Sequence, residues 1–152
     1  MSSAIIAAAD SPEDVAAAKA LFVAYQAWLG VDLCFQGFDA EIARFPQGYE
    51  VVLLAKLDGA PAGAVGLRAL DASACEMKRL YVPEAFQGRG LGRALSVRLM
   101  DEARSRGFKL MRLDTLNRLE PAIALYRDLG FAECEAYYNN PVEGVIYMEC
   151  AL

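Results

Sequence analysis

A glycine-rich stretch in the middle of the chain carries the clearest chemical signal. Residues 87–93 read Gln-Gly-Arg-Gly-Leu-Gly-Arg and lie between a strand-like apolar segment and a helix-like one. Glycine lets backbone N–H groups approach a ligand closely, and the free N–H groups and dipole at a helix start favour anions. Arg89 and Arg93 add positive charge at the same place. The stretch therefore predicts a phosphate-binding loop.

Two common phosphate motifs do not fit this loop. A P-loop needs G-x-x-x-x-G-K-[ST], but counting from Gly88 puts Arg93 where the second glycine should stand. A dinucleotide fingerprint needs G-x-G-x-x-G, and Arg93 again takes the place of its third glycine. The pattern that fits is Q-x-x-G-x-G, formed by Gln87, Gly90 and Gly92. The alternative interpretation is a flexible glycine turn without a ligand.

The charge distribution agrees with an anionic ligand at the loop. The chain of 152 residues has a formal net charge of −5, which argues against a nucleic-acid partner. Residues 78–112 nevertheless hold nine basic and three acidic residues. This basic window within an acidic protein indicates local binding of an anion rather than a basic protein surface.

The elements around the loop are predicted in the order β-α-α-β-β-β-α-β-α-β-β. Strands are expected at residues 5–9, 50–57, 62–69, 75–82, 109–116, 131–137 and 144–151, and helices at 12–29, 36–45, 93–106 and 121–129. Asp58-Gly59 is a strong two-residue hairpin signal. Antiparallel hairpins followed by a βαβ crossover predict a mixed sheet with helices on both faces. We expect one domain over residues 1–152.

Two segments resemble the GCN5-related N-acetyltransferase (GNAT) superfamily. CEMKRLYVPEAFQGRGLGRAL (residues 75–95) looks like the family's acetyl-CoA strand, loop and helix, and AIALYRDLGF (residues 122–131) looks like its following helix and strand start. The resemblance covers about residues 3–151. It implies an α/β (α+β) fold, with a mixed, mostly antiparallel, splayed sheet between helices, and acetyl-CoA as the cosubstrate.

The resemblance also implies where acetyl-CoA binds. The cofactor would lie where the strand containing Leu80, Tyr81 and Val82 parts from the strand at 109–116, with backbone groups of Leu80 and Val82 pairing with the pantetheine arm. The loop after Gln87 would hold the pyrophosphate through the N–H groups of Gly88, Arg89, Gly90, Leu91, Gly92 and Arg93. The sequence departs from the family at Leu119, where many members have Asn; Asn117 comes two residues early.

Catalysis has to proceed without histidine, because the chain has none. This excludes Ser-His-Asp and Cys-His mechanisms and most catalytic zinc sites, and we expect no metal. By the resemblance, Glu76 has the register of the glutamate base of histone-acetylating members, and Tyr126 that of the tyrosine that protonates the leaving thiolate. Strand alternation predicts Glu76, Lys78, Leu80 and Val82 on one face. The alternatives are a salt bridge for Glu76 and a core position for Tyr126.

The cysteines point to a reducing compartment rather than to chemistry. None of them forms a CxxC pair, which favours free thiols in the cytoplasm: Cys34, Cys75, Cys134 and Cys150. Cys75 is predicted to face away from Glu76, and an acyl-cysteine route stays open beside a buried structural role. No apolar run reaches the roughly 18–20 residues of a membrane span, and the first residues lack a basic signal region. We expect a cytoplasmic protein without a membrane partner.

The acceptor side is less defined in the sequence. Arg68, Lys78 and Arg79 are candidates for binding a substrate carboxylate, with Lys78 and Arg79 expected on opposite faces of their strand. Aromatic and turn residues that could line the cleft are Trp28, Phe35, Phe38, Tyr137, Tyr138 and 139–141.

The sequence as a whole predicts an acetyl-CoA-dependent N-acetyltransferase that transfers acetyl directly to a primary amine of a small metabolite. A protein or peptide acetyltransferase acting on Lys or N-terminal amines is one alternative. A non-catalytic acyl-CoA-binding sensor is another. A monomer and a homodimer are both compatible with the sequence.

Overall fold

The secondary-structure elements follow the predicted order, with ends shifted by a few residues and a shorter sixth strand. The computed structural model describes residues 4–33 and 36–152. The strands are β1 (Ala4–Ala8), β2 (Val51–Leu57), β3 (Ala60–Ala69), β4 (Ala74–Tyr81), β5 (Leu110–Leu116), β6 (Ala132–Cys134) and β7 (Val145–Ala151). The helices are α1 (Pro12–Leu29), α2 (Phe38–Arg44), α3 (Leu91–Ser105) and α4 (Glu120–Asp128), with a 3-10 turn, η2 (Glu84–Phe86).

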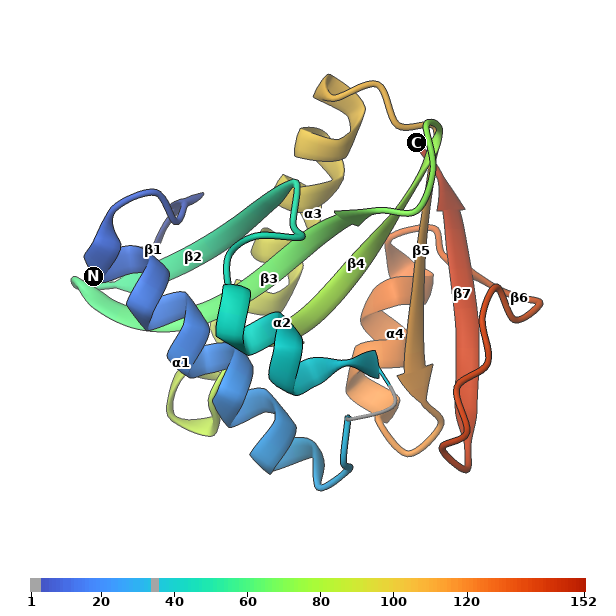
Figure 1. Ribbon diagram of the computed structural model, residues 1–152, viewed down its shortest axis with the longest axis horizontal. Helices are drawn as coiled ribbons and strands as arrows, with labels where there is room; N and C mark the ends of the chain where they lie inside the picture. The colour runs from blue at the N-terminus through green and yellow to red at the C-terminus, as the bar shows by residue number, and fades with distance from the viewer. Residues whose placement is uncertain (1–3, 34–35) are drawn as a thin grey trace.

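The described strands form one sheet in the order β1-β2-β3-β4-β5-β7-β6. Its neighbouring strands are antiparallel except for β4 and β5, which run parallel on either side of the α3 crossover. Helices α1 and α2 cover one face, and α3 and α4 cover the other (Figure 1). The prediction of a mixed, mostly antiparallel sheet with helices on both faces is confirmed.

Local signals explain the ends of α1. The Ser11 hydroxyl accepts a hydrogen bond from the N–H of Asp14 at 3.1 Å, and Pro12 supplies a first helical residue that needs no partner for its nitrogen. Gly30 ends the helix with a φ of 73°, in the left-handed region that glycine adopts without penalty. Serine, proline and glycine thus set the length of the helix that covers β3 and β4.

Each face of the sheet has its own core. On one face, Leu95 and Leu99 of α3 are completely buried against strand residues that include Leu53 and Leu67. On the other, the buried ring of Phe22 in α1 packs edge-on against Phe45 and Tyr49, with centroids 5.0 and 5.6 Å apart. Each such side chain contributes about 1.5–3 kcal/mol through burial. These two cores fix the strands whose ends form the site. In the described part of the chain, none of the helices combines the length and apolarity needed to cross a membrane.

Candidate active site

β4 and β5 pair over only three residues. Their parallel ladder joins residues 74–76 to residues 110–112, and the strands then diverge (Figure 1). The pairing of β5 with β7 continues over residues 110–116, so the divergence belongs to the junction of β4 and β5, which we call the seam. Backbone groups beyond the ladder need other partners there. The seam is the region in which the sequence predicts acetyl-CoA.

A β-bulge re-aims the second half of β4. Between the pairs Gly66–Lys78 and Ala64–Tyr81, β3 has one residue and β4 has two. Arg79, within the bulge, has a φ of 61°. A residue other than glycine in this region costs about 1–3 kcal/mol, and such residues concentrate at functional sites. The bulge therefore lies where the strand must turn toward the seam.

Two predictions that rest on regular alternation are wrong because of this bulge. Glu76 and Lys78 do share the face of α1 and α2, but Leu80 and Val82 pack with the core under α3. Lys78 and Arg79 were expected on opposite faces, but both donate to Oε1 of Gln36, at 3.3 and 2.7 Å. One extra residue in the strand shifts every later side chain to the other face.

A groove of about 510 Å³ lies between the end of β4 and the first turns of α3 and α4. Seven of the ten predicted cofactor residues line it: Leu80, Tyr81, Val82, Gln87, Gly88, Leu91 and Gly92. The opposite wall includes Ala122 and Leu125 of α4. The side-chain amide of Gln87 donates to the carbonyl of Val82 at 2.9 Å and so ties the loop to the strand. A site of this size can hold part of a nucleotide cofactor.

The glycine loop places free backbone N–H groups at one end of the groove. Gly88 and Gly90 have φ values of 82° and 76°, and Gly90 immediately precedes α3. The first N–H groups of a helix have no intrahelical partner, and no side chain caps them here. With the positive end of the helix dipole, they can bind an anionic group such as phosphate.

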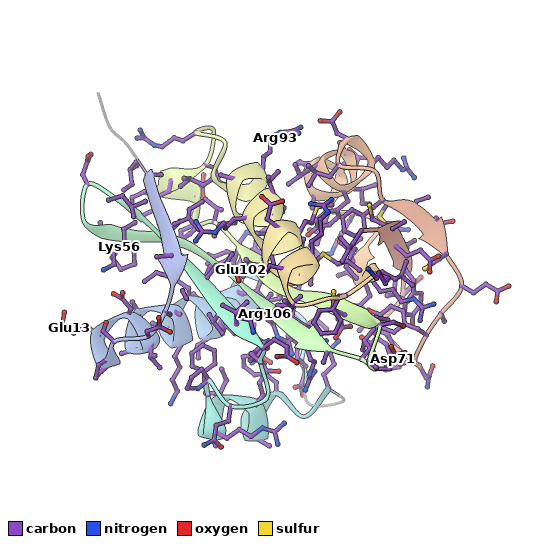
Figure 2. The ribbon with its side chains drawn as sticks, turned by 90° about the horizontal axis from the view of Figure 1, so that it is seen from above. Glu13, Lys56, Asp71, Arg93, Glu102 and Arg106 are labelled. Carbon is purple, nitrogen blue, oxygen red and sulfur yellow. The ribbon has the colours of Figure 1, made fainter. Side chains whose placement is uncertain are left out.

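The two arginines of the loop lie outside the groove lining. Arg93, labelled in Figure 2, forms an ion pair with Asp128 at the end of α4, and both side chains are exposed. Arg89 is also exposed. Surface pairs of this kind contribute at most about 1 kcal/mol. Contact of either guanidinium with a pyrophosphate stays a prediction, and Arg93 would exchange Asp128 for the phosphate.

Leu119, at the position of the family's asparagine, lines the groove just before α4. Asn117 instead faces Gly144, whose carbonyl accepts its N–H at 2.8 Å. The structure thus offers an apolar wall where many relatives of this pattern have an amide. Trp28, predicted for the acceptor side, also lies on the groove, half exposed and 5.8 Å from the ring of Tyr81. Trp28 therefore lines the same groove as the predicted cofactor residues, and it does not line the polar cavity described below.

Tyr126 lies beside the seam at the inner end of the groove. It is 7% exposed and packs edge-on against Phe131, with centroids 5.9 Å apart. It also lines a cavity of about 80 Å³ between the strands, together with Met77 and Asp114. Burial raises the pKa of Tyr126, so its phenol stays protonated near neutral pH. The position suits a proton donor at the seam as well as an aromatic core residue.

A second large cavity, of about 300 Å³, lies on the face of α1 and α2, and we call it the polar cavity. Its polar and aromatic lining consists of Gln36, Arg68, Glu76, Lys78, Tyr137 and Tyr138. Four of the residues predicted for the acceptor side, Arg68, Lys78, Tyr137 and Tyr138, therefore lie together with the predicted base.

Shared lining residues connect the polar cavity to the groove. It shares Gln36 and Lys78 with a cavity of about 40 Å³ at the seam. That cavity shares Met77 and Asp114 with the one at Tyr126, which in turn borders the groove. The cavities thus lie next to one another from one face of the sheet to the other, and they share side chains of the seam as walls.

Glu76 is 3% exposed and held by two neighbours in the polar cavity. The hydroxyl of Tyr137 donates to its Oε2 at 2.5 Å, and Nζ of Lys78 lies 3.8 Å from its Oε1. Burial raises the pKa of Glu76, although Lys78 and the Tyr137 hydrogen bond oppose this, and burial lowers the pKa of Lys78. A carboxylate whose pKa is raised toward neutrality is suited to accept a proton.

A chain of hydrogen bonds crosses the seam next to the cavities, and we call it the polar bridge. It runs from Glu41 to Arg79 (3.1 Å), to Gln36 (2.7 Å), to Tyr138 (2.7 Å) and to Asp114. The bridge connects α2 and β4 on one side to β5 on the other. It holds the walls of the acceptor-side cavities at a fixed separation.

Sequence reasoning missed three residues of the polar bridge: Glu41, Gln36 and Asp114. Asp114 had a signal, because a carboxylate in the middle of a buried strand needs a partner or a function. Glu41 and Gln36 looked like surface residues of a short helix. Phe38, predicted to line the cleft, is buried and lies 5.1 Å from the Arg79 guanidinium. Phe35 and Cys34 lie outside the described residues.

The three cysteines within the described residues, Cys75, Cys134 and Cys150, line neither the groove nor the polar cavity. Cys75 is completely buried in the core under α3, facing away from Glu76 as predicted. Burial raises the pKa of Cys75 to about 12, so the reactive thiolate is not populated near neutral pH. An acyl-cysteine intermediate at this position is therefore disfavoured. Over residues 4–33 and 36–152, no cluster of His, Cys, Asp or Glu side chains could hold a metal ion.

Comparison with known families and sequences points in one direction. The model of the acetyltransferase (GNAT) family matches residues 18–131 of this chain. An uncharacterised N-acetyltransferase of Schizosaccharomyces pombe is 36% identical over 149 residues, which cover 94% of this chain and 91% of the relative.

Solved structures share the architecture. The Salmonella typhimurium protein yncA, solved with its cofactor acetyl-CoA, superposes with a TM-score of 0.70 at 26% identity, covering 98% of this chain and 94% of that chain. The ribosomal-protein-S18-alanine N-acetyltransferase of Escherichia coli superposes with a TM-score of 0.73 at 24% identity, with the same coverage of 98% and 94%. The second likeness concerns the fold alone.

Proposed function

The chain belongs to the acetyltransferase (GNAT) family, and we propose that it transfers the acetyl group of acetyl-CoA directly to the primary amine of a small molecule. Acetyl-CoA occupies the groove, with its pyrophosphate at the glycine loop and its thioester at the seam. The amine enters through the polar cavity on the other face. The observation that supports this proposal is the series of neighbouring cavities on both sides of the seam, which places the groove and the polar cavity close to the same strand ends.

The reaction needs two protons to leave the acceptor nitrogen, because an ammonium group becomes a secondary amide. Glu76 takes the first, through water, and releases it to solvent. The nitrogen lone pair then attacks the thioester carbonyl, and collapse of the tetrahedral intermediate breaks the C–S bond. Tyr126 donates a proton to the leaving thiolate and regains one from the second N–H. The products are the amide, CoA as its thiol and one proton.

The size of the acceptor side favours a small molecule over a protein segment. The polar cavity holds about 300 Å³, at the lower end of the range for small-molecule sites. Its walls come from Gln36 before α2, from β3 and β4, and from the segment after β6, and the polar bridge lies along one side. A free metabolite with one amine fits a space of this volume.

Calorimetric titration with acetyl-CoA and CoA tests the cofactor half of the proposal. A matched pair of variants assigns the site, because Gly90 and Gly107 both have positive φ (76° and 89°) and open space at the Cβ position. Gly90→Ala and Gly107→Ala therefore carry the same conformational cost, of about 1 kcal/mol. Only Gly90 lies at the anion end of the groove, so we expect only Gly90→Ala to weaken CoA binding.

Release of CoA thiol with a panel of amines tests the catalytic half. We expect intersecting initial-velocity lines when both substrates are varied, as direct transfer requires. Parallel lines would indicate an acyl-enzyme. No binding of acetyl-CoA or CoA near millimolar concentration would refute the whole proposal, and CoA binding without thiol release from any amine would leave a sensor.

A further inference from the structure

The polar cavity contains a cation that the rest of the protein leaves available. Arg68 on β3 is half-buried and lines the cavity. Within the described part of the chain, no carboxylate lies within ion-pair distance of its guanidinium. Arg79, the other arginine of this region, is neutralised by Glu41. Arginine recognises carboxylates through paired hydrogen bonds, so Arg68 is a ready site for an incoming carboxylate.

Arg68 lies next to Glu76 on the adjacent strand, which limits how far apart the two charged groups of a ligand can be. The two residues are direct partners in the antiparallel ladder of β3 and β4. Cβ atoms of such partners lie about 4.5–5.5 Å apart. The Glu76 carboxylate nevertheless turns to Tyr137 and Lys78 instead of Arg68. The cavity thus has one positive and one negative group side by side in its lining.

Resting on the proposed function, we infer that the acceptor is a free α-amino acid, with its carboxylate on Arg68 and its amino group on Glu76. An α-amino acid carries its two charged groups on one carbon, which matches two neighbouring partners on adjacent strands. Tyr137 and Tyr138 supply aromatic walls for the side chain. The cavity volume of about 300 Å³ suffices for a single amino acid.

The charges of the cavity disfavour other classes of amine. Arg68 and Lys78 stand against the single carboxylate of Glu76, so a polyamine or an aminoglycoside brings further positive charge to a site with surplus cation. A simple alkylamine leaves Arg68 without a partner. An amino acid amide keeps the amine and the side chain but removes the charge that Arg68 recognises, so it isolates the contribution of the carboxylate.

CoA release is measured with the twenty L-amino acids, and then with the amide and the decarboxylated amine of the best one. We expect kcat/KM for the amino acid to exceed that of either analogue by about tenfold or more, the effect of one charged hydrogen-bonded contact. Arg68→Gln should remove this preference by raising KM for the amino acid, with kcat changed little. Arg68→Lys should restore part of it. Arg104→Gln, on the outer surface of α3 in a pair with Asp101, is the matched control and should leave the preference intact.

Equal kcat/KM for amino acid, amide and amine would overturn the inference, and so would a preference that survives Arg68→Gln. In both cases acetyl transfer itself still occurs, so the proposed function stands. If no amine is turned over, binding of amino acids to the CoA-loaded protein is read by calorimetry. Binding that Arg68→Gln weakens supports the inference without catalysis, and no binding refutes it. Failure of the protein to bind CoA refutes the proposed function separately.

Discussion

Removal of the Arg79 side chain should destabilise the protein strongly. Arg79 and Glu41 are 6% and 2% exposed, and their N–O distance is 3.1 Å. Arg79→Met keeps much of the volume but leaves the Glu41 carboxylate buried, and among the described residues the Tyr49 hydroxyl, at 2.7 Å, is then its remaining side-chain donor. Breaking a buried pair on one side costs about 3–5 kcal/mol, because an uncompensated charge stays in the interior.

Urea unfolding and thermal unfolding, both followed by circular dichroism, measure this loss. With about 2–4 °C per kcal/mol for a domain of this size, the melting temperature should fall by roughly 6–20 °C. Arg112→Met is the matched control, because Arg112 pairs with Glu149 at 3.2 Å in the same sheet while both side chains are about one-third exposed. An exposed pair contributes at most about 1 kcal/mol, so this variant should unfold near the wild type.

The pH dependence gives the same prediction a second readout. Burial by itself would raise the pKa of Glu41, but hydrogen bonds and charge from Arg79 outweigh it and hold that pKa below its usual range. A lowered folded-state pKa contributes stability above the unfolded pKa of about 4.3, and this contribution is lost as pH falls through the folded value. In Arg79→Met the acid-induced loss should shrink. Equal stability of Arg79→Met and Arg112→Met would refute the reasoning.

Three further predictions concern catalysis and packing. Tyr126→Phe should lower kcat far more than it changes the Kd of acetyl-CoA, measured by calorimetry; unchanged turnover would return Tyr126 to a core role. Because burial raises the pKa of Glu76, kcat of the wild type should rise with pH through that pKa, and Glu76→Gln should lose this rise. An unaltered pH–rate profile would make Glu76 structural. Gly66→Ala should cost about 1–3 kcal/mol in urea unfolding, because its Cβ would lie 2.5 Å from the Tyr49 ring, whereas Gly92→Ala, with 3.6 Å to its nearest neighbour, should not destabilise.

The order of the elements could be predicted because local signals mark their ends. Ser11 and Gly30 bound α1, Asp58-Gly59 turns the hairpin, and alternating or continuous apolar runs identify the strands. The groove was foreseen for a similar reason, since its lining comes from one contiguous segment and the helix after it. Such features depend on residues close in sequence, and for those residues the spacing along the chain determines which side chains are in contact.

The interior of the site depends on residues far apart in sequence. The bulge at Arg79 has no local signature, and it reversed the faces expected for the residues after it. The polar bridge links residues 36, 41, 79, 114 and 138, whose meeting follows from tertiary packing. Tyr137 as the hydrogen-bond donor to Glu76 is a contact across 61 positions. The periodicity of a single sequence does not predict contacts between residues that lie so far apart along the chain.

The short ladder at the seam has a mechanical consequence. Strands β1–β4 form one half of the sheet and β5–β7 the other, and three paired residues at one end join them. The two halves of the sheet are therefore joined at one end and diverge toward the other (Figure 1). The groove lies at the diverging end. The polar bridge and the core under α3, which contains Met77 of β4 and Leu113 of β5, both cross this junction and resist separation of the two halves. A ligand that contacts both halves of the sheet holds them together, and amide hydrogen exchange near the seam should slow when the ligand binds.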